Sequence, residues 1–291
     1  MKTGPRRQQI LNLLEETGSL DVGDLADRFA VSVVTIRKDL DDLEREGLLQ
    51  RTFGGAVFSH RSRFNRSFLE RASQHLPEKL AIAAAALEYI KEGDTIILDA
   101  GTTTLALAQV LKTHVKSAFI ITCSVPVALE VSSAGYDILL LGGMVRNKSL
   151  ALLGRETLWM LDRYRADKAF LGSSGFTIEK GHTTPNPEDA QVKEAIMRVS
   201  REKYVLVDSS KFGDQCLTRF ANLRDIDLTI TDSRLPKAKI KALEAAGAAL
   251  RIVDVERTGP KRNEKDASLP NGEDPQVSPS RTLNLHRNRK R

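Results

Sequence analysis

The chain has 291 residues, of which 41% are hydrophobic, and a formal net charge of +6 at pH 7. This length accommodates a small domain and a larger one with an ordinary core. No apolar run approaches the roughly 18 residues that cross a bilayer, and the first residues lack a signal peptide's apolar stretch, so we expect a cytoplasmic protein without membrane contact. The two cysteines, Cys123 and Cys216, lack metal-ligand spacing, and we expect no disulfide framework, no metal and no cofactor.

The first predicted elements are two amphipathic helices. One has its apolar stripe at Ile10, Leu13 and Leu14. The next has Asp21 as its expected N-cap, followed by Asp24 in the first turn. Its buried positions, at helical spacing, are Val22, Leu25, Ala26 and Phe29.

A third helix and a hairpin complete a winged helix-turn-helix pattern over residues 19–57, with the reading motif at about 20–39. Ser32 is the expected N-cap of this helix. Its inward stripe consists of Val33, Ile36, Leu40 and Leu43. Two short strands then flank Gly54 and Gly55, glycines that supply positive φ in a tight turn.

This third helix has the side chains of a DNA reader. Thr35, Arg37 and Lys38 lie on the outward side of its first two turns, and such donors reach phosphates and guanine edges in the major groove. The expected DNA-binding residues are Arg6, Arg7, Ser32, Thr35, Arg37, Lys38 and Arg51. The alternative is an ordinary helical bundle with solvated charges. Residues 47–71 favour the reader, because they hold five arginines against one glutamate.

The charge of the first helices bears on assembly. Residues 1–46 contain seven basic and ten acidic residues, which is a weak balance for neutralising phosphates. We therefore expect a homo-oligomer that places two or more reader helices on repeated half-sites of double-stranded DNA.

Residues 59–77 are interpreted as a connector between domains, and apolar strands then alternate with helices. A buried helix is expected over 80–90. The strands are predicted at 95–99, 118–122, 137–142, 168–172, 204–208, 227–231 and 249–253. The helices are predicted at 104–112, 126–133, 188–203 and 237–247. This alternation predicts a parallel sheet covered by helices, whose ligands bind beyond the carboxyl ends of the strands.

Polar residues follow those strand ends. After the first strand come Asp99, Gly101 and the three hydroxyls of Thr102, Thr103 and Thr104, at the start of a helix whose amides attract anions. The alternative is a threonine-rich helix cap without a ligand. Three other strand ends support an anion site, with Gly143 and Arg146, with Ser173, Ser174 and Gly175, and with Ser209, Ser210 and Lys211.

Residues 3–255 resemble the DeoR family of bacterial sugar-metabolism repressors. The similar segments are VSVVTIRKDLDDLEREGLLQRTFGGAV, DAGTTTLALA, LLLGGMVR, LALLGRET, DKAFLGSSG, TTPNPEDAQVKEA and DSSKFG. The resemblance divides the chain into a DNA-binding domain over 3–58, the connector, and an effector-sensing α/β domain over 78–255. Ala30 departs from the polar residue that is common in the inter-helix turn.

The resemblance implies that the second domain is related in fold to ribose-5-phosphate isomerase and senses a phosphorylated sugar or related metabolite. Asp99 and the loop through Thr104 would then hold the phosphate, with Lys193 and Lys211 facing the rest of the ligand. The expected effector site consists of Asp99, Gly101, Thr102, Thr103, Thr104, Thr122, Ser124, Gly143, Arg146, Ser174, Gly175, Lys193 and Lys211. Lys193 has an alternative role as a solvated partner of Asp189. Cys123 replaces the usual asparagine, which removes a donor and an acceptor.

An isomerase-like enzyme is the alternative function. Proton transfer between sugar carbons needs a carboxylate base, and the segment Gly172–Gly175 has none where the isomerases carry an acidic loop. Glu188 and Asp189 are nearby but also suit a helix start. We therefore expect no catalytic residues and a transcriptional repressor that its effector releases from DNA.

The resemblance does not extend to residues 256–291. This segment holds four of the ten prolines, has no aromatic residue and ends in HRNRKR, so we expect a disordered basic tail. Such a tail either adds non-specific affinity for DNA or is a solvated extension without function.

Overall fold

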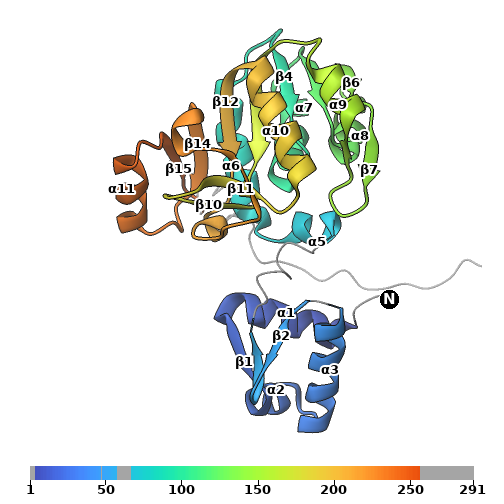
Figure 1. Cartoon of the computed structure of the whole chain (residues 1–291), viewed down its shortest axis with the longest axis vertical. Helices are drawn as coiled ribbons and strands as arrows, with labels where there is room; N and C mark the ends of the chain where they lie inside the picture. The colour runs from blue at the N-terminus through green and yellow to red at the C-terminus, as the bar shows by residue number, and fades with distance from the viewer. Residues whose placement is uncertain (1–3, 47, 58–66, 256–291) are drawn as a thin grey trace, which may run out of the picture. The chain divides into compact units, whose positions relative to one another are not determined.

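The computed structural model describes residues 4–46, 48–57 and 67–255 (Figure 1). Residues 5–57 form an N-terminal domain with its own core. Its elements are α1 (Pro5–Thr17), β1 (Ser19–Asp21), α2 (Val22–Phe29), α3 (Val33–Arg45), β2 (Gln50–Thr52) and β3 (Gly55–Val57). The three strands pair antiparallel in the order β1-β3-β2. The predicted winged helix-turn-helix is thus confirmed, and β1 is an addition that the sequence did not indicate.

Local capping explains where the helices of this domain begin. The Asp21 side chain accepts hydrogen bonds from the amides of Gly23 and Asp24, and Ser32 accepts one from Thr35, as predicted. The core contains the expected apolar side chains Ile10, Leu14, Val22, Leu25, Ala26, Ile36, Leu40 and Leu43. Val33 is an exception, because it is 39% exposed at the first position of α3 and so lies off the inward stripe.

Residues 67–255 form a C-terminal domain around a seven-stranded parallel sheet of order β15-β14-β12-β9-β4-β5-β6. Its strands are β4 (Thr95–Leu98), β5 (Phe119–Thr122), β6 (Asp137–Leu140), β9 (Ala166–Gly172), β12 (Ser200–Leu206), β14 (Leu228–Asp232) and β15 (Leu250–Val253). The helices are α5 (Phe68–Ser73), α6 (Leu76–Ala86), α7 (Thr102–His114), α8 (Val125–Ser132), α9 (Arg155–Leu161), α10 (Pro187–Val199) and α11 (Lys237–Ala245), with short 3-10 turns η1 (Leu87–Tyr89), η2 (Ser209–Lys211) and η3 (Leu223–Asp225). The predicted parallel, helix-covered sheet is confirmed.

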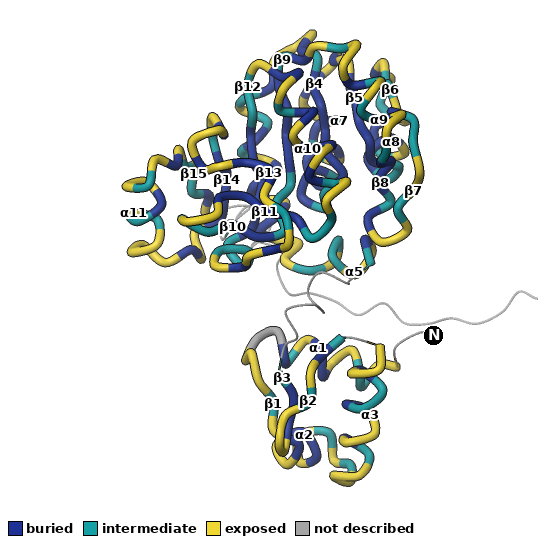
Figure 2. Tube along the Cα trace, in the orientation of Figure 1, coloured by how far each residue is buried: buried dark blue, intermediate teal, exposed yellow. Residues whose placement is uncertain are grey.

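Helices cover both faces of this sheet, and Figure 2 shows its strands as the most buried part of the domain. Side chains alternate along β4, so that Ile96 and Leu98 join the core under α6, α7 and α8, while Ile97 joins the core under α9 and α10. Because both faces are buried, the strands are continuously apolar rather than amphipathic. Within the described parts of the chain, none of the helices has the length and apolar character needed to cross a membrane.

Small antiparallel elements that the sequence did not reveal complete the domain. A second sheet has the order β10-β11-β13, from β10 (Gly175–Thr177), β11 (Gly181–Thr184) and β13 (Thr218–Ala221). A two-stranded ribbon joins β7 (Met144–Arg146) to β8 (Ala151–Leu153). The predicted helix 188–203 was too long: Ser200 already pairs with Ala166 of β9, and this sheet pairing ends α10 at Val199.

The connector predicted over 59–77 was wrong for its second half. Residues 58–66 lie outside the described residues, but Ser67 and Glu70 form a capping box that starts α5. Phe68, only 2% exposed, fixes this helix to the C-terminal domain, and α6 begins at Leu76. The predicted tail over 256–291 also lies outside the described residues.

Candidate functional site

The outer surface of α3 presents the side chains expected of a DNA reader. Ser32 fixes the start of the helix, and Thr35 is held by a 2.9 Å hydrogen bond between its hydroxyl and that of Ser32. Arg37 and Lys38 are exposed on the following positions. Val34, beside them, is a large apolar side chain that is also exposed.

The other basic residues predicted to contact DNA are tied into the domain. The Arg6 Nε lies 2.6 Å from an Asp39 carboxylate oxygen, and the Arg7 Nε lies 3.0 Å from the other oxygen. Burial alone would raise the pKa of Asp39, but hydrogen bonds from both arginines outweigh it and lower the pKa. These pairs brace α1 against α3, and contact of the two arginines with phosphate stays a prediction.

The wing is built on a two-residue turn at Phe53 and Gly54. Gly54 has φ +96° and supplies the left-handed conformation, whereas Gly55 does not have positive φ, so our expectation for that residue was wrong. Gly55 is needed because an added Cβ would collide with the Leu20 carbonyl of β1. Arg51 of β2 donates hydrogen bonds to the carbonyl oxygens of Gly55 and Arg37, at 3.2 Å each, and so joins the wing to α3.

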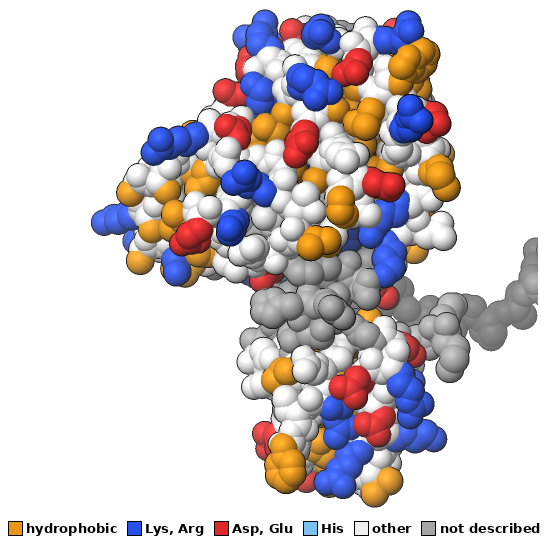
Figure 3. All heavy atoms as spheres, in the orientation of Figure 1, with side chains coloured by type: hydrophobic (Ala, Val, Ile, Leu, Met, Phe, Trp, Pro, Cys, Tyr) orange, Lys and Arg blue, Asp and Glu red, His pale blue; other side chains and the backbone are white. Residues whose placement is uncertain are grey.

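Basic and acidic side chains are interleaved on the face of the N-terminal domain that Figure 3 shows. Arg6 and Arg7 share the single buried carboxylate of Asp39, and Arg7 also pairs with Asp42. Arg37 and Lys38 therefore make up a larger share of the exposed positive charge of this domain than a count of its basic residues indicates.

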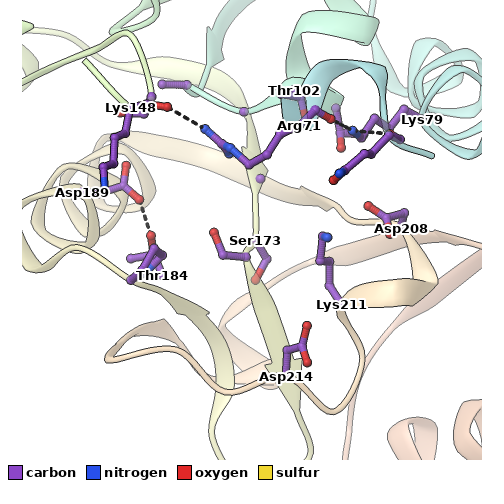
Figure 4. Close-up of a pocket in the computed structure, with 18 of the residues that line it drawn as sticks. Arg71, Lys79, Thr102, Lys148, Ser173, Thr184, Asp189, Asp208, Lys211 and Asp214 are labelled. Atoms are coloured by element: carbon purple, nitrogen blue, oxygen red, sulfur yellow. Dashed lines mark hydrogen bonds between the residues drawn. The ribbon is translucent and has the colours of Figure 1, made fainter. Parts of the chain in front are cut away.

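A cavity lies at the carboxyl ends of β4, β9 and β12 (Figure 4). This is the edge at which the sequence placed the anion site. Seven of the predicted effector residues line it: Gly101, Thr102, Thr103, Arg146, Ser174, Lys193 and Lys211.

The loop from β4 into α7 forms one wall of this cavity. Gly101 is the N-cap of α7, and Thr102 and Thr103 occupy its first turn. The first amides of a helix lack partners within the helix and attract anions. Thr104 turns inward instead, donating to the Asp99 carbonyl at 2.6 Å and accepting from the Gly101 amide at 2.9 Å. Thr104 therefore shapes the loop and does not line the cavity.

Positive charge dominates the lining. The basic side chains are Arg71, Lys79, Arg146, Lys148, Lys193 and Lys211, and the acidic ones are Asp189, Asp208 and Asp214. His75 also lines the cavity, and burial lowers its pKa, which favours the neutral ring. A cavity with twice as many cations as carboxylates suits an anionic ligand with additional hydroxyl groups.

Asp99 lies behind the cavity wall and is fully buried. One of its oxygens accepts hydrogen bonds from the Gly172 amide at 3.0 Å and from the Lys193 ammonium, which also donates to the Gly172 carbonyl at 3.1 Å. The alternative of a solvated Lys193 is wrong, because this residue is 4% exposed. Asp99 thus positions Lys193 and the loop after β9.

The remaining predicted effector residues also have structural positions outside the lining. Thr122 donates to the Leu98 carbonyl at 2.6 Å, and Ser124 caps α8. An added Cβ at Gly143 would collide with the Leu153 carbonyl, and one at Gly175 with the Asp214 carbonyl. Cys123, the departure from the family pattern, is 1% exposed, and burial raises its thiol pKa. These residues build the strand ends that carry the site.

Sequence reasoning missed part of the lining. Four of the missed residues come from α5, α6 and the two residues between these helices, in or beside the segment interpreted as a connector: Arg71, Gln74, His75 and Lys79. The other missed lining residues are Ala100, Lys148, Ser149, Gly172, Thr184, Pro185, Asp189, Asp208 and Asp214, whereas Ser173 lies in a loop that the sequence indicated. Asp208 carried a usable signal, because it is the polar residue at the carboxyl end of the predicted strand 204–208.

The carboxylates at the cavity bear on the isomerase alternative. Asp189 accepts a hydrogen bond from the Thr184 hydroxyl, and Asp208 accepts one from the Ser210 amide at 3.2 Å. Glu188 is exposed and does not line the cavity. In the described residues, no cluster of His, Cys, Asp and Glu is arranged to hold a metal ion.

Two family models match the chain. The DeoR-like helix-turn-helix domain matches residues 6–62, and the DeoR C-terminal sensor domain matches residues 74–233. The match to the sensor domain begins inside the segment that we interpreted as a connector, in agreement with the fold.

Relatives of similar length carry the names of regulators. The chain is 36% identical to the uncharacterized HTH-type transcriptional regulator FruR of Bacillus subtilis, over 80% of this chain and 92% of the relative. It is 33% identical to the HTH-type transcriptional regulator GlpR of Haloferax volcanii, over 86% and 98%. It is also 33% identical to a putative aga operon transcriptional repressor of Escherichia coli O157:H7, over 86% and 94%.

Among solved structures, a ribose 5-phosphate isomerase from Methanocaldococcus jannaschii aligns with 47% of this chain and 54% of its own, at 19% identity and a TM-score of 0.35. The family models and the named relatives agree on a DNA-binding regulator rather than an enzyme. The chain belongs to the DeoR family of transcriptional regulators.

Proposed function

We propose that this transcriptional regulator represses a carbohydrate operon and that a phosphorylated sugar, bound in the cavity of the C-terminal domain, releases it from operator DNA. The observation that carries the proposal is the cavity itself. The first turn of α7 and the side chains of Arg146 and Lys211 line it together, which suits a phosphate group. Ser174 and the carboxylates of Asp208 and Asp214 supply partners for sugar hydroxyls.

The names of two relatives support the proposal that the regulated operon serves carbohydrate metabolism. One is named a putative aga operon transcriptional repressor, and another, from Staphylococcus epidermidis, a lactose phosphotransferase system repressor. An effector changes DNA affinity only through its different affinity for the two states of the protein, typically by about 1 to 3 kcal/mol. Repression and its relief then depend on one equilibrium between two states of the protein, of which one binds operator DNA more tightly and the other binds the effector more tightly.

We also propose a homo-oligomer that acts in the cytoplasm on the nucleoid. A single reader helix with few unpaired cations gives limited phosphate neutralisation, so paired half-sites raise the affinity. The expected DNA contacts are those of α3 and the wing, with Arg37 and Lys38 foremost.

The test is binding to labelled DNA from around the protein's own gene at physiological salt, with a panel of phosphorylated sugars and the same sugars without phosphate. We expect tight binding that one phosphorylated compound releases. Release by an unphosphorylated sugar alone would contradict the anionic effector. Absence of DNA binding, together with turnover of ribose 5-phosphate, would favour the isomerase alternative instead.

A further inference from the structure

Helix α5 lies between the N-terminal domain and the sheet in the chain order, yet it supplies a cation to the cavity. Arg71 extends from α5 towards Lys148 in the turn between β7 and β8 (Figure 4). Its Nη2 donates to the Lys148 carbonyl at 3.4 Å, which is near the limit of a hydrogen bond. Its buried Nε has no hydrogen-bond partner. This guanidinium therefore has unused donors at the wall of a cavity.

A buried guanidinium nitrogen without a hydrogen-bond partner is unfavourable. Burial lowers the pKa of Arg71, and the positive charge of Arg146 lowers it further, although Asp189 and Asp99 act in the opposite direction. The guanidinium carbon lies over the Phe68 ring, 5.8 Å from its centre, a cation–π contact that leaves the donor at Nε unpaired. An anion between Arg71 and Arg146 would relieve both the like-charge repulsion and the missing hydrogen bond.

Lys79 ties the same helix to the cavity from the other side. Its ammonium donates to the Arg71 carbonyl and, at 2.6 Å, to the Gln74 carbonyl, which are partly buried acceptors at the end of α5. Lys79 is 3% exposed and also lines the cavity. The position of α5 is thus set by two cations that a ligand can contact.

We propose that Arg71 is an effector-binding residue and that α5 transmits occupancy of the cavity to the chain that leads to the DNA-binding domain. The proposal rests on the proposed function, since it requires an anionic effector. Only residues 58–67 separate α5 from the wing strand β3 in the sequence. A guanidinium that donates two parallel hydrogen bonds to a phosphate fixes the orientation of the ligand. It also fixes the orientation of the helix that carries the arginine.

A purely structural role for Arg71 makes a different prediction. If the guanidinium served only to bind the Lys148 carbonyl, its removal would change stability and leave the preference for phosphorylated ligands intact. The two roles are therefore separated by measuring ligand preference rather than stability alone.

The experiment uses the full-length chain and isothermal calorimetry with inorganic phosphate, phosphorylated pentoses and hexoses, and the corresponding free sugars. The variants are Arg71→Ala, Arg71→Lys, which retains the charge, and Arg198→Ala, a control whose surface guanidinium pairs with Asp162 at 3.1 Å. We expect Arg71→Ala to weaken binding of the phosphorylated sugar about tenfold or more and to leave free sugars unaffected. Arg71→Lys should recover part of the loss, and Arg198→Ala should match the wild type.

Amide hydrogen exchange on the same samples tests transmission. In the wild type, the effector should slow exchange over residues 67–75, and in Arg71→Ala at saturating effector this slowing should be absent. If the wild type binds a phosphorylated sugar and Arg71→Ala binds it equally well, the role of Arg71 is refuted while the proposed function stands. If the wild type binds no phosphorylated compound, the proposed function itself fails, and the role of Arg71 fails with it.

Discussion

Asp99 and Lys193 form a buried ion pair that joins the end of β4 to α10 at the cavity. Burial alone would lower the pKa of Lys193, but the negative charges of Asp189 and Asp99 and the hydrogen bond that Lys193 donates to Asp99 outweigh it and raise the pKa. Both side chains are almost fully buried, with exposed fractions of 0% and 4%. Each charge therefore depends on the other, and the pair holds the cationic wall in place.

Removing one member of this pair should be strongly destabilising. Asp99→Ala leaves the Lys193 ammonium without its closest counter-charge, and we expect a loss of about 3 to 5 kcal/mol in the free energy of unfolding. The double variant Asp99→Ala/Lys193→Met should recover much of this loss. Urea unfolding followed by Trp159, which lies in α9 and is the chain's one tryptophan, reports on the C-terminal domain. If the losses of unfolding free energy from the two single substitutions simply added in the double variant, the energetic coupling between Asp99 and Lys193 would be contradicted.

Lys79 predicts a pH dependence of stability. Burial lowers its pKa from 10.5 to about 8. Between these values the unfolded chain binds more protons than the folded chain, so raising the pH favours the folded state. We expect the wild type to gain stability relative to Lys79→Met as the pH rises from about 8 to 10, by on the order of 2 to 3 kcal/mol. Urea unfolding of both proteins at several pH values measures the difference between their free energies of unfolding. A difference that stays constant with pH would contradict the prediction.

The sequence predicted the parallel sheet and the polar loop after β4 because both follow from strong local patterns. Continuous apolar segments such as Thr95–Leu98 indicate buried strands, and the polar residues after them must meet at one edge. That geometry brought Thr102, Lys211 and Arg146 to the same cavity. It did not distinguish Thr102, which lines the cavity, from Thr104, which turns inward.

Other parts of the site left no such pattern. Residues Gly181–Thr184 form a fully buried strand of polar residues, which hydrophobic periodicity does not detect. Its Thr183 accepts from the Cys216 amide at 3.0 Å and donates to the Gly175 carbonyl at 3.0 Å, contacts that depend on the tertiary fold. Helix α5 has six residues, too few to show a period, and its arginine is one of several in this part of the sequence.

Arg37 should contribute to DNA binding without contributing to stability. Its side chain is exposed on α3, so Arg37→Ala should weaken operator binding by about 1 to 3 kcal/mol and leave the unfolding temperature unchanged. Arg45→Ala is the control, because Arg45 lies at the far end of the same helix and its side chain is 75% exposed. Fluorescence anisotropy with labelled operator DNA measures both. Equal affinities of Arg37→Ala and the wild type would remove α3 from the proposed interface.

Arg7 should behave differently from Arg37, since it braces α1 against α3. Its pairs with Asp39 and Asp42 are partly buried, and Arg7→Ala leaves Asp39 with one cationic partner. We expect a lower unfolding temperature of the N-terminal domain together with weaker DNA binding. If Arg7→Ala weakened DNA binding at unchanged stability, Arg7 would instead be a direct phosphate contact, as the sequence first suggested.

Ala30 is a site where a single substitution should stabilise the protein. It ends α2 in the left-handed conformation, with φ 51° and ψ 45°, and its side chain is exposed, so the methyl group brings strain without contacts. Ala30→Gly should stabilise the N-terminal domain by about 0.5 to 1 kcal/mol, because glycine adopts this conformation freely. The same change at the exposed Ala238, inside α11, should destabilise by a similar amount, since glycine weakens a regular helix. Thermal unfolding of both variants measures the two stability changes, which should have opposite signs. A loss of stability in Ala30→Gly would contradict the prediction. It would mean that the extra freedom of glycine in the unfolded chain outweighs the strain that is relieved in the folded turn.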